Sequence, residues 1–114
     1  MDEDSNRRHR GTRAVITGGT QGLGLAAARR IAREGASGIV LAGRRADLGE
    51  AAAVGVRALG AECFFVQADV GKVEDCTRLM ATAITKLGTV NALVNSAAIT
   101  DRGTLLDTSL EMWQ

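Results

Sequence analysis

Short apolar runs alternate with longer amphipathic segments along most of the chain. Runs rich in β-branched or aromatic residues are typical of buried strands. The predicted strands are Arg13–Thr17, Gly38–Ala42, Glu62–Ala68 and Val90–Asn95. Between them, apolar residues recur three and four positions apart, which is the spacing of a helix that buries one face. The predicted helices, each followed by a glycine that can end it, are Gly22–Glu34, Ala46–Leu59 and Val73–Leu87.

The same spacing assigns the buried faces of the helices. The first helix is predicted to bury Leu23, Ala27 and Ile31 and to expose its arginines. The inner face predicted for the third helix consists of Val73, Cys76, Leu79, Met80, Ala83, Ile84 and Leu87. Strands that alternate with helices of this length predict a parallel sheet with right-handed crossovers. The expected fold class is therefore α/β, a doubly wound parallel sheet of about four strands in the order 3-2-1-4.

The junction between the first strand and the first helix is rich in glycine. It reads Thr-Gly-Gly-Thr-Gln-Gly-Leu-Gly over residues 17–24. A phosphate group must approach the backbone closely there, and the N–H groups at the helix start can bind it. A P-loop is excluded because Leu25 and Ala26, not Lys and Ser or Thr, follow Gly24. The string Gly22-Leu-Gly-Leu-Ala-Ala27 fits the dinucleotide pattern G-x-G-x-x-A, with a glycine turn that binds no ligand as the minor alternative.

The wider spacing, Thr-Gly-x-x-x-Gly-x-Gly, resembles the cofactor loop of the short-chain dehydrogenase/reductase family, and the resemblance extends from Arg13 onward. Asp69-Val70 is similar to the family's pair that contacts the adenine ring, although an aspartate there could instead cap the next helix. Asn95-Ser-Ala-Ala98 is similar to the family's Asn-Asn-Ala-Gly motif, with Ser96 and Ala98 as departures. The cofactor-binding residues that the resemblance implies are Gly18, Thr20, Gln21, Gly22, Leu23, Gly24, Arg44, Asp69, Val70, Asn95 and Ala97.

The end of the second strand bears on the choice of cofactor. An acidic residue there would hydrogen-bond the ribose of NAD, whereas a basic one favours the additional phosphate of NADP. Gly43 stands at this position and Arg44 and Arg45 follow it. Arginine matches phosphate in charge and in the geometry of its donors, so NADP is favoured over NAD. The alternative is that both arginines merely lie in solvent at a helix start.

The resemblance implies hydride transfer between nicotinamide and a carbonyl or alcohol carbon, with tyrosine as the acid or base and a lysine four residues later. The chain has no tyrosine, and its lysines, Lys72 and Lys86, lie on or beside the third predicted helix. No catalytic residue can therefore be assigned. Thr108-Ser-Leu-Glu111 has the form of a capping box, yet the chain stops at Gln114. We expect an oxidoreductase fragment that is inactive alone; the alternatives are a non-catalytic NADP(H)-binding module and a non-functional truncated product.

Composition narrows the remaining possibilities. Apolar residues make up 46% and charged residues 24%, and the net charge is +1, so neither nucleic acid nor a membrane is an expected partner. The resemblance implies a Rossmann-like domain over residues 12–114, a small carbonyl or alcohol substrate, and oligomers only at full length. Residues 1–11 read as a disordered polar tail, and its His9 is the only histidine, which argues against a metal site. Two distant cysteines favour a cytoplasmic protein.

Overall fold

A computed structural model describes residues 8–18 and 20–95. These residues form one four-stranded sheet, flanked by helices, in which every strand pair is parallel. The strands are β1 (Arg13–Thr17), β2 (Gly38–Gly43), β3 (Glu62–Gln67) and β4 (Ala92–Asn95). The helices are α2 (Gly22–Arg33), α3 (Ala46–Arg57) and α4 (Val73–Leu87). The strand order is β3-β2-β1-β4, which confirms the predicted doubly wound α/β fold.

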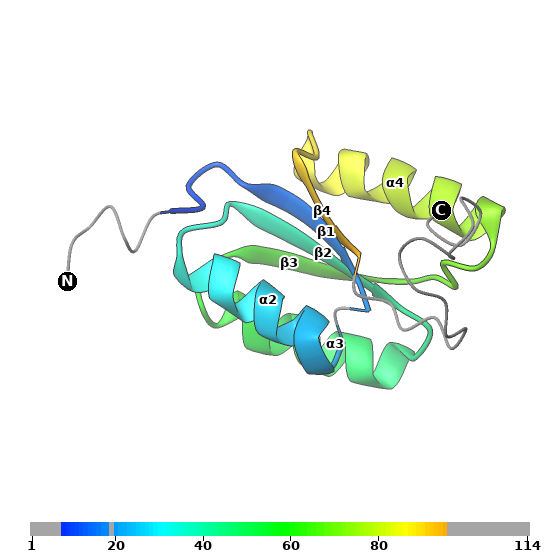
Figure 1. The fold of residues 1–114 in the computed structure, drawn as a ribbon, viewed down its shortest axis with the longest axis horizontal. Helices are drawn as coiled ribbons and strands as arrows, with labels where there is room; N and C mark the ends of the chain where they lie inside the picture. The colour runs from blue at the N-terminus through cyan, green and yellow to red at the C-terminus, as the bar shows by residue number, and fades with distance from the viewer. Residues whose placement is uncertain (1–7, 19, 96–114) are drawn as a thin grey trace, which may run out of the picture.

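The sheet separates two apolar cores (Figure 1). α2 and α3 cover one face, where Ile16, Ile39 and Leu41 are fully buried. α4 covers the other face, onto which Val15 and Val40 point. Because successive side chains of a strand point to opposite faces, strands buried on both sides read as continuous apolar runs. This explains why β1 and β2 were recognisable from sequence as unbroken hydrophobic segments.

The buried faces of the helices are narrower than the spacing predicted. Leu23 of α2 is 86% exposed, and Val73 and Ile84 of α4 are 77% and 51% exposed, so the prediction that these three are buried is wrong. The residues that α2 does bury are small and four positions apart: Gly24, Ala28 and Ala32. The equivalent stripe of α4 is Leu79, Ala83 and Leu87. Small side chains let a helix approach the sheet closely, so only one stripe fits beneath it and the neighbouring rows remain in solvent.

The last residues of the predicted polar tail that the structure describes contact the end of α2. The backbone N–H of His9 donates to the carbonyl oxygen of Glu34 over 2.8 Å. The buried Glu34 carboxylate accepts a hydrogen bond from Arg30 Nε (3.1 Å), and Arg8 Nε and His9 Nε2 lie 3.9 and 3.4 Å from its oxygens. Glu34 therefore joins residues 8 and 9 to the helix through both its backbone and its side chain.

Replacing the Glu34 carboxylate should make the thermal stability of the chain change less as the pH falls into the acid range. The hydrogen bond from Arg30, with the charges of Arg30, Arg8 and His9, lowers the pKa of Glu34 from 4.5 despite some desolvation. The stabilisation from the ionised carboxylate is therefore complete above pH 4.5 and lost as the pH falls through the lower folded-state value. At pH 7 we expect Glu34→Gln to lower Tm by a few degrees, and the difference from wild type to shrink below pH 4.5.

Thermal melts across this pH range check the prediction. Glu50→Gln, at an exposed position of α3, is the matched control and should change Tm little at any pH. A Glu34→Gln difference that stays constant from pH 7 to pH 3 would show that the charge of Glu34 contributes nothing.

Within residues 8–18 and 20–95, no helix combines the length and the apolarity needed to cross a membrane.

Candidate cofactor-binding site

The predicted site residues that the structure describes lie at the carboxyl edge of the sheet. Parallel strands bring their carboxyl ends together, and ligands of doubly wound sheets bind just outside this edge. Two backbone hydrogen bonds of 2.9 Å connect the turns beyond the strands: Gly18 donates to Ala42, and Ala68 donates to Gly43. The turns that follow β1, β2 and β3 are thus neighbours. Ala97 and the predicted capping box at Thr108–Glu111 lie outside the described residues.

The glycine loop adopts a backbone that requires glycine. Gly18 and Gly22 have φ values of +69° and +62°, in the left-handed region that other residues seldom adopt. A Cβ atom added at Gly22 would meet no atom of the other residues that the structure describes within 4 Å. The loop therefore presents bare backbone toward open space beside the start of α2, as close approach of a phosphate group requires.

The start of α2 differs electrostatically from the starts of the other helices. Its N-cap, Gln21, makes no side-chain capping hydrogen bond, and its first turn holds no acidic residue. α3 carries Asp47 in its first turn, and α4 carries Glu74 and Asp75. Acidic side chains there compensate the positive end of the helix dipole. The uncompensated end of α2 adjoins the glycine loop, so this part of the edge fits an anionic ligand.

The turn between β2 and α3 abuts the glycine loop. A Cβ atom added at Gly43 would come within 3.0 Å of Thr20 Cγ2, so any larger side chain at this position would displace Thr20. The Arg45 guanidinium is held in an ion pair with Asp47 (2.8 Å). The Arg44 side chain is exposed and forms no ion pair with the residues that the structure describes. Arg44 therefore places beside the loop a positive charge that has no counterion among residues 8–18 and 20–95.

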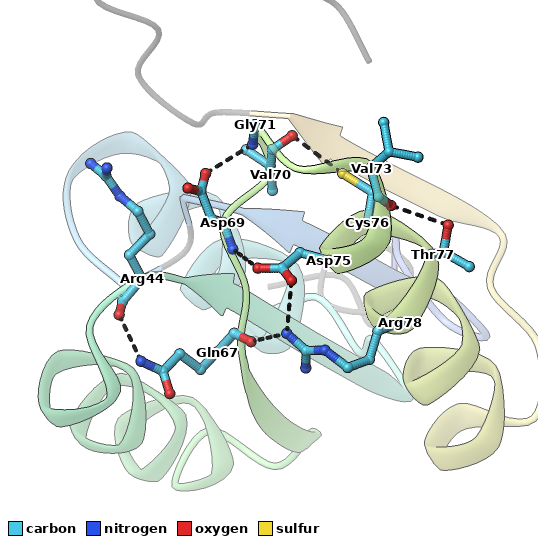
Figure 2. Close-up of polar contacts among 10 residues, drawn as sticks. All are labelled: Arg44, Gln67, Asp69, Val70, Gly71, Val73, Asp75, Cys76, Thr77 and Arg78. Carbon is cyan, nitrogen blue, oxygen red and sulfur yellow. Dashed lines mark hydrogen bonds and ion pairs between the residues drawn. The ribbon is translucent and has the colours of Figure 1, made fainter.

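The turn after β3 is organised around Asp69 (Figure 2). The Asp69 N–H donates to Asp75 Oδ2 (2.8 Å), and Asp69 Oδ1 accepts a hydrogen bond from the N–H of Gly71 (2.9 Å). The N-cap of α4 is Lys72, not Asp69, which removes the alternative in which Asp69 caps that helix. Val70 is half-buried, and its carbonyl oxygen accepts a bond from Cys76 Sγ (3.3 Å). The predicted adenine-contacting pair thus forms a turn fixed from both sides.

The end of β4 is tied to the end of β1. Thr17 and Asn95 are paired in the strand register, and Thr17 Oγ1 donates to Asn95 Oδ1 over 2.9 Å. The hydroxyl also lies 3.5 Å from the carbonyl oxygen of Val94. Asn95 therefore has a side-chain partner on the neighbouring strand, and this contact joins the ends of β1 and β4.

One residue of this edge was missed by the sequence reasoning. Gln67, the last residue of β3, donates from Nε2 to the carbonyl oxygen of Arg44 (3.1 Å). An exposed glutamine at a strand end carries no distinctive sequence signal, because its partner is 23 positions away and adjacent only in the folded sheet.

The cysteine of β3, Cys63, is a core residue and does not belong to this edge. Cys63 lies in the core beneath α3, where burial raises the pKa of its thiol to about 12. It remains protonated at neutral pH and is unreactive, as expected for a packing residue. Cys63 therefore adds no nucleophile to the carboxyl edge of the described sheet.

Comparison with known proteins agrees with this geometry. The family model described as short chain dehydrogenase matches residues 12–114. The NADP-dependent (R)-specific alcohol dehydrogenase of Lentilactobacillus kefiri is 39% identical over 108 residues, which are 94% of this chain and 42% of that enzyme. A hydroxysteroid dehydrogenase from Escherichia coli superimposes with a TM-score of 0.78 at 33% identity, over 86% of this chain and 41% of the other.

A third similar protein was solved with its ligands. L-sorbose reductase from Gluconobacter frateurii, complexed with NADPH and L-sorbose, superimposes with a TM-score of 0.77 at 32% identity and covers 96% of this chain. This chain spans about two fifths of the length of these relatives, between 41% and 42% in the three cases. The match nevertheless extends over nearly all of this chain, which therefore belongs to the short-chain dehydrogenase family.

Proposed function

We propose that the chain is the cofactor-binding part of an NADP(H)-dependent oxidoreductase that acts on a carbonyl or alcohol substrate. The observation that carries the proposal is the contact of two features at one edge of the sheet. A glycine loop with a left-handed, open backbone leads into the uncompensated end of α2. The exposed Arg44 stands next to it, where Gly43 meets Thr20.

Each turn of the edge has a part in the proposed binding. The N–H groups between Gly18 and Gly24, with Thr20, Gln21 and Leu23 around them, would hold the pyrophosphate. Asp69 and Val70 would contact the adenine ring, and Asn95 with Ala97 would line the nicotinamide ribose. The bound cofactor would supply the hydride. The 114 residues contain no tyrosine, so we assign this chain the binding role and no proton transfer.

The preference for NADP rests on charge. A guanidinium without a counterion among the described residues is the group that a 2′-phosphate would pair with, since arginine binds phosphate through paired charge-assisted hydrogen bonds. No acidic side chain occupies position 43 to accept from the ribose hydroxyls of NAD. Two similar proteins support this choice, because one is named as NADP-dependent and the other was solved with NADPH. We also propose a cytoplasmic location, which is favoured by Cys63 being a free thiol in the described part of the chain.

Thermal melts of the chain with each cofactor test this proposal. A ligand at about 100 times its Kd adds about 2.7 kcal/mol to the stability of the native state, which is a shift of several degrees for a domain of this size. We expect NADPH to raise Tm more than NADH at equal concentration. A larger shift with NADH would refute the NADP preference. No shift with either would refute cofactor binding and favour the non-functional product.

Two neighbouring arginines provide a matched pair for the same experiment. Arg44→Ala should weaken NADPH binding about tenfold and leave NADH binding unchanged, because only the 2′-phosphate loses its partner. Arg45→Ala should change neither, since the Arg45 guanidinium is already paired with Asp47. Equal effects of the two substitutions would mean that general positive charge, not Arg44 itself, attracts the phosphate.

A further inference from the structure

A continuous set of polar contacts connects the turn that holds Arg44 with the turn that holds Asp69 (Figure 2). Its centre is Gln67, whose side-chain amide donates to the Arg44 carbonyl oxygen (3.1 Å) and whose own carbonyl oxygen accepts from Arg78 Nη2 (2.6 Å). Arg78 lies 3.7 Å from Asp75 Oδ1, and Asp75 Oδ2 accepts the Asp69 N–H. The two turns proposed to hold the adenosine half of the cofactor therefore share one network.

The hydrogen bond from the Gln67 side chain lies just beyond the last backbone hydrogen bond between β2 and β3. The register between β2 and β3 ends at the pair formed by Gly43 and Gln67, and the Ala68 N–H takes the carbonyl oxygen of Gly43. The carbonyl oxygen of Arg44 is the next acceptor along this chain, and it is held by a side chain instead of by the ladder. Gln67 thereby fixes the orientation of the peptide between Arg44 and Arg45, outside the sheet.

That peptide is attached to the Cα of Arg44, so holding it restricts the backbone from which the Arg44 side chain projects. In the view of Figure 2, the guanidinium extends away from the Gln67 amide and toward the side on which the Asp69 carboxylate lies. Only a donor at position 67 can hold a carbonyl oxygen. A glutamate has the same length as glutamine but no donor when ionised, so it would repel the oxygen that glutamine binds.

We propose that Gln67 is a positioning residue for cofactor preference, which holds the Arg44 peptide so that the guanidinium faces the 2′-phosphate of NADP. This inference rests on the proposed function, because it presupposes that Arg44 binds that phosphate. Gln67 acts through Arg44 and does not itself contact the phosphate. Its effect should therefore be confined to ligands that carry a 2′-phosphate.

The experiment compares two probes by calorimetric titration of the chain. Adenosine 2′,5′-bisphosphate carries the 2′-phosphate, and 5′-AMP lacks it. Gln67→Ala and Gln67→Glu should each weaken binding of the bisphosphate about fivefold, the effect of one lost hydrogen bond, and change binding of 5′-AMP less than twofold. Glu62→Gln, at the exposed opposite end of β3, is the control and should change neither. Melts of each variant verify that it is folded at the temperature of titration.

A double-mutant cycle separates positioning from a general effect on structure. In an Arg44→Ala background, adding Gln67→Ala should cause no further loss of bisphosphate affinity, because the group that Gln67 positions is already gone. Additive losses, or an equal weakening of both probes by Gln67→Ala, would overturn the inference. The inference would also fail if the wild-type chain prefers the bisphosphate and the Gln67 variants show the same ratio of the two affinities. If the wild-type chain shows no such preference, the proposed NADP specificity fails first, and this inference with it.

Discussion

A Gly22→Asp variant will bind NADPH at least about 100-fold more weakly than the wild-type chain, which corresponds to about 2.7 kcal/mol. Gly22 lies in the left-handed region at the start of α2, and a side chain there would enter the open space beside the glycine loop. A carboxylate in that space would face the pyrophosphate, and like charges brought together in a binding site cost several kcal/mol. Titration calorimetry or fluorescence of the bound nicotinamide measures the loss.

Gly22→Asn is the matched control for charge. Asparagine has nearly the same shape as aspartate, and both tolerate the left-handed region better than most residues. The added Cβ meets no atom within 4 Å in the described part of the chain, so both variants should fold and melt within a few degrees of each other. We expect Gly22→Asn to lose about tenfold in affinity through bulk alone. If Gly22→Asp binds NADPH as tightly as Gly22→Asn does, the phosphate groups do not lie at this loop.

The second large effect concerns a glycine inside α3. Gly49 is buried, and a Cβ atom added there would overlap the ring of Phe65 on β3. Overpacking of this kind costs about 1–3 kcal/mol. For a domain of this size that is a fall in Tm of roughly 5–15 °C for Gly49→Ala. Urea or thermal unfolding followed by circular dichroism measures the change.

Gly55→Ala in the same helix provides the comparison. A Cβ atom at Gly55 would lie 3.9 Å from Arg29 Nη2, an ordinary contact. Alanine is favoured over glycine in a helix interior by up to about 1 kcal/mol, so Gly55→Ala should stabilise the chain. The same propensity gain applies at both positions, and the difference between the two variants isolates the overlap with Phe65. If Gly49→Ala stabilises the chain as much as Gly55→Ala does, the close packing of α3 on β3 is wrong.

The strands and their order were predictable because both faces of β1 and β2 are covered. A strand buried on both sides must be apolar at every position, and such a run between glycines has few other interpretations. The helices were recognisable from apolar residues three and four positions apart, but the width of their buried faces was not predictable. How many rows of a helix reach the sheet depends on the distance between the two, which the small residues Gly24, Ala28 and Ala32 set. Leu23 of the same helix was misplaced on this account.

The site was predictable where backbone conformation demands a residue type. Gly18 and Gly22 stand where φ is positive, and their spacing could be read directly. Residues that act through a distant backbone atom could not be found in this way. The bonds from Gln67 to Arg44 and from Asp75 to Asp69 exist only because the sheet brings successive turns together. A glutamine or an aspartate beside a turn has many uses, and the sequence does not distinguish among them.

The strands of the described sheet differ in how many neighbours they have and how deeply they are buried, so the carboxyl edge differs in local stability from one end to the other. β1 and β2 each have two neighbours and are buried throughout most of their length, whereas β4 pairs only with β1 among the described strands, and its Leu93 is 62% exposed. Local opening occurs most readily where few apolar contacts must be broken. The loop and turns proposed for the phosphates therefore stand on the most persistent strands. The Thr17–Asn95 contact joins the well-buried β1 to the more exposed β4. A nucleotide bound there would reduce the local motion of β4, whereas β1 and β2 are already held by their neighbours.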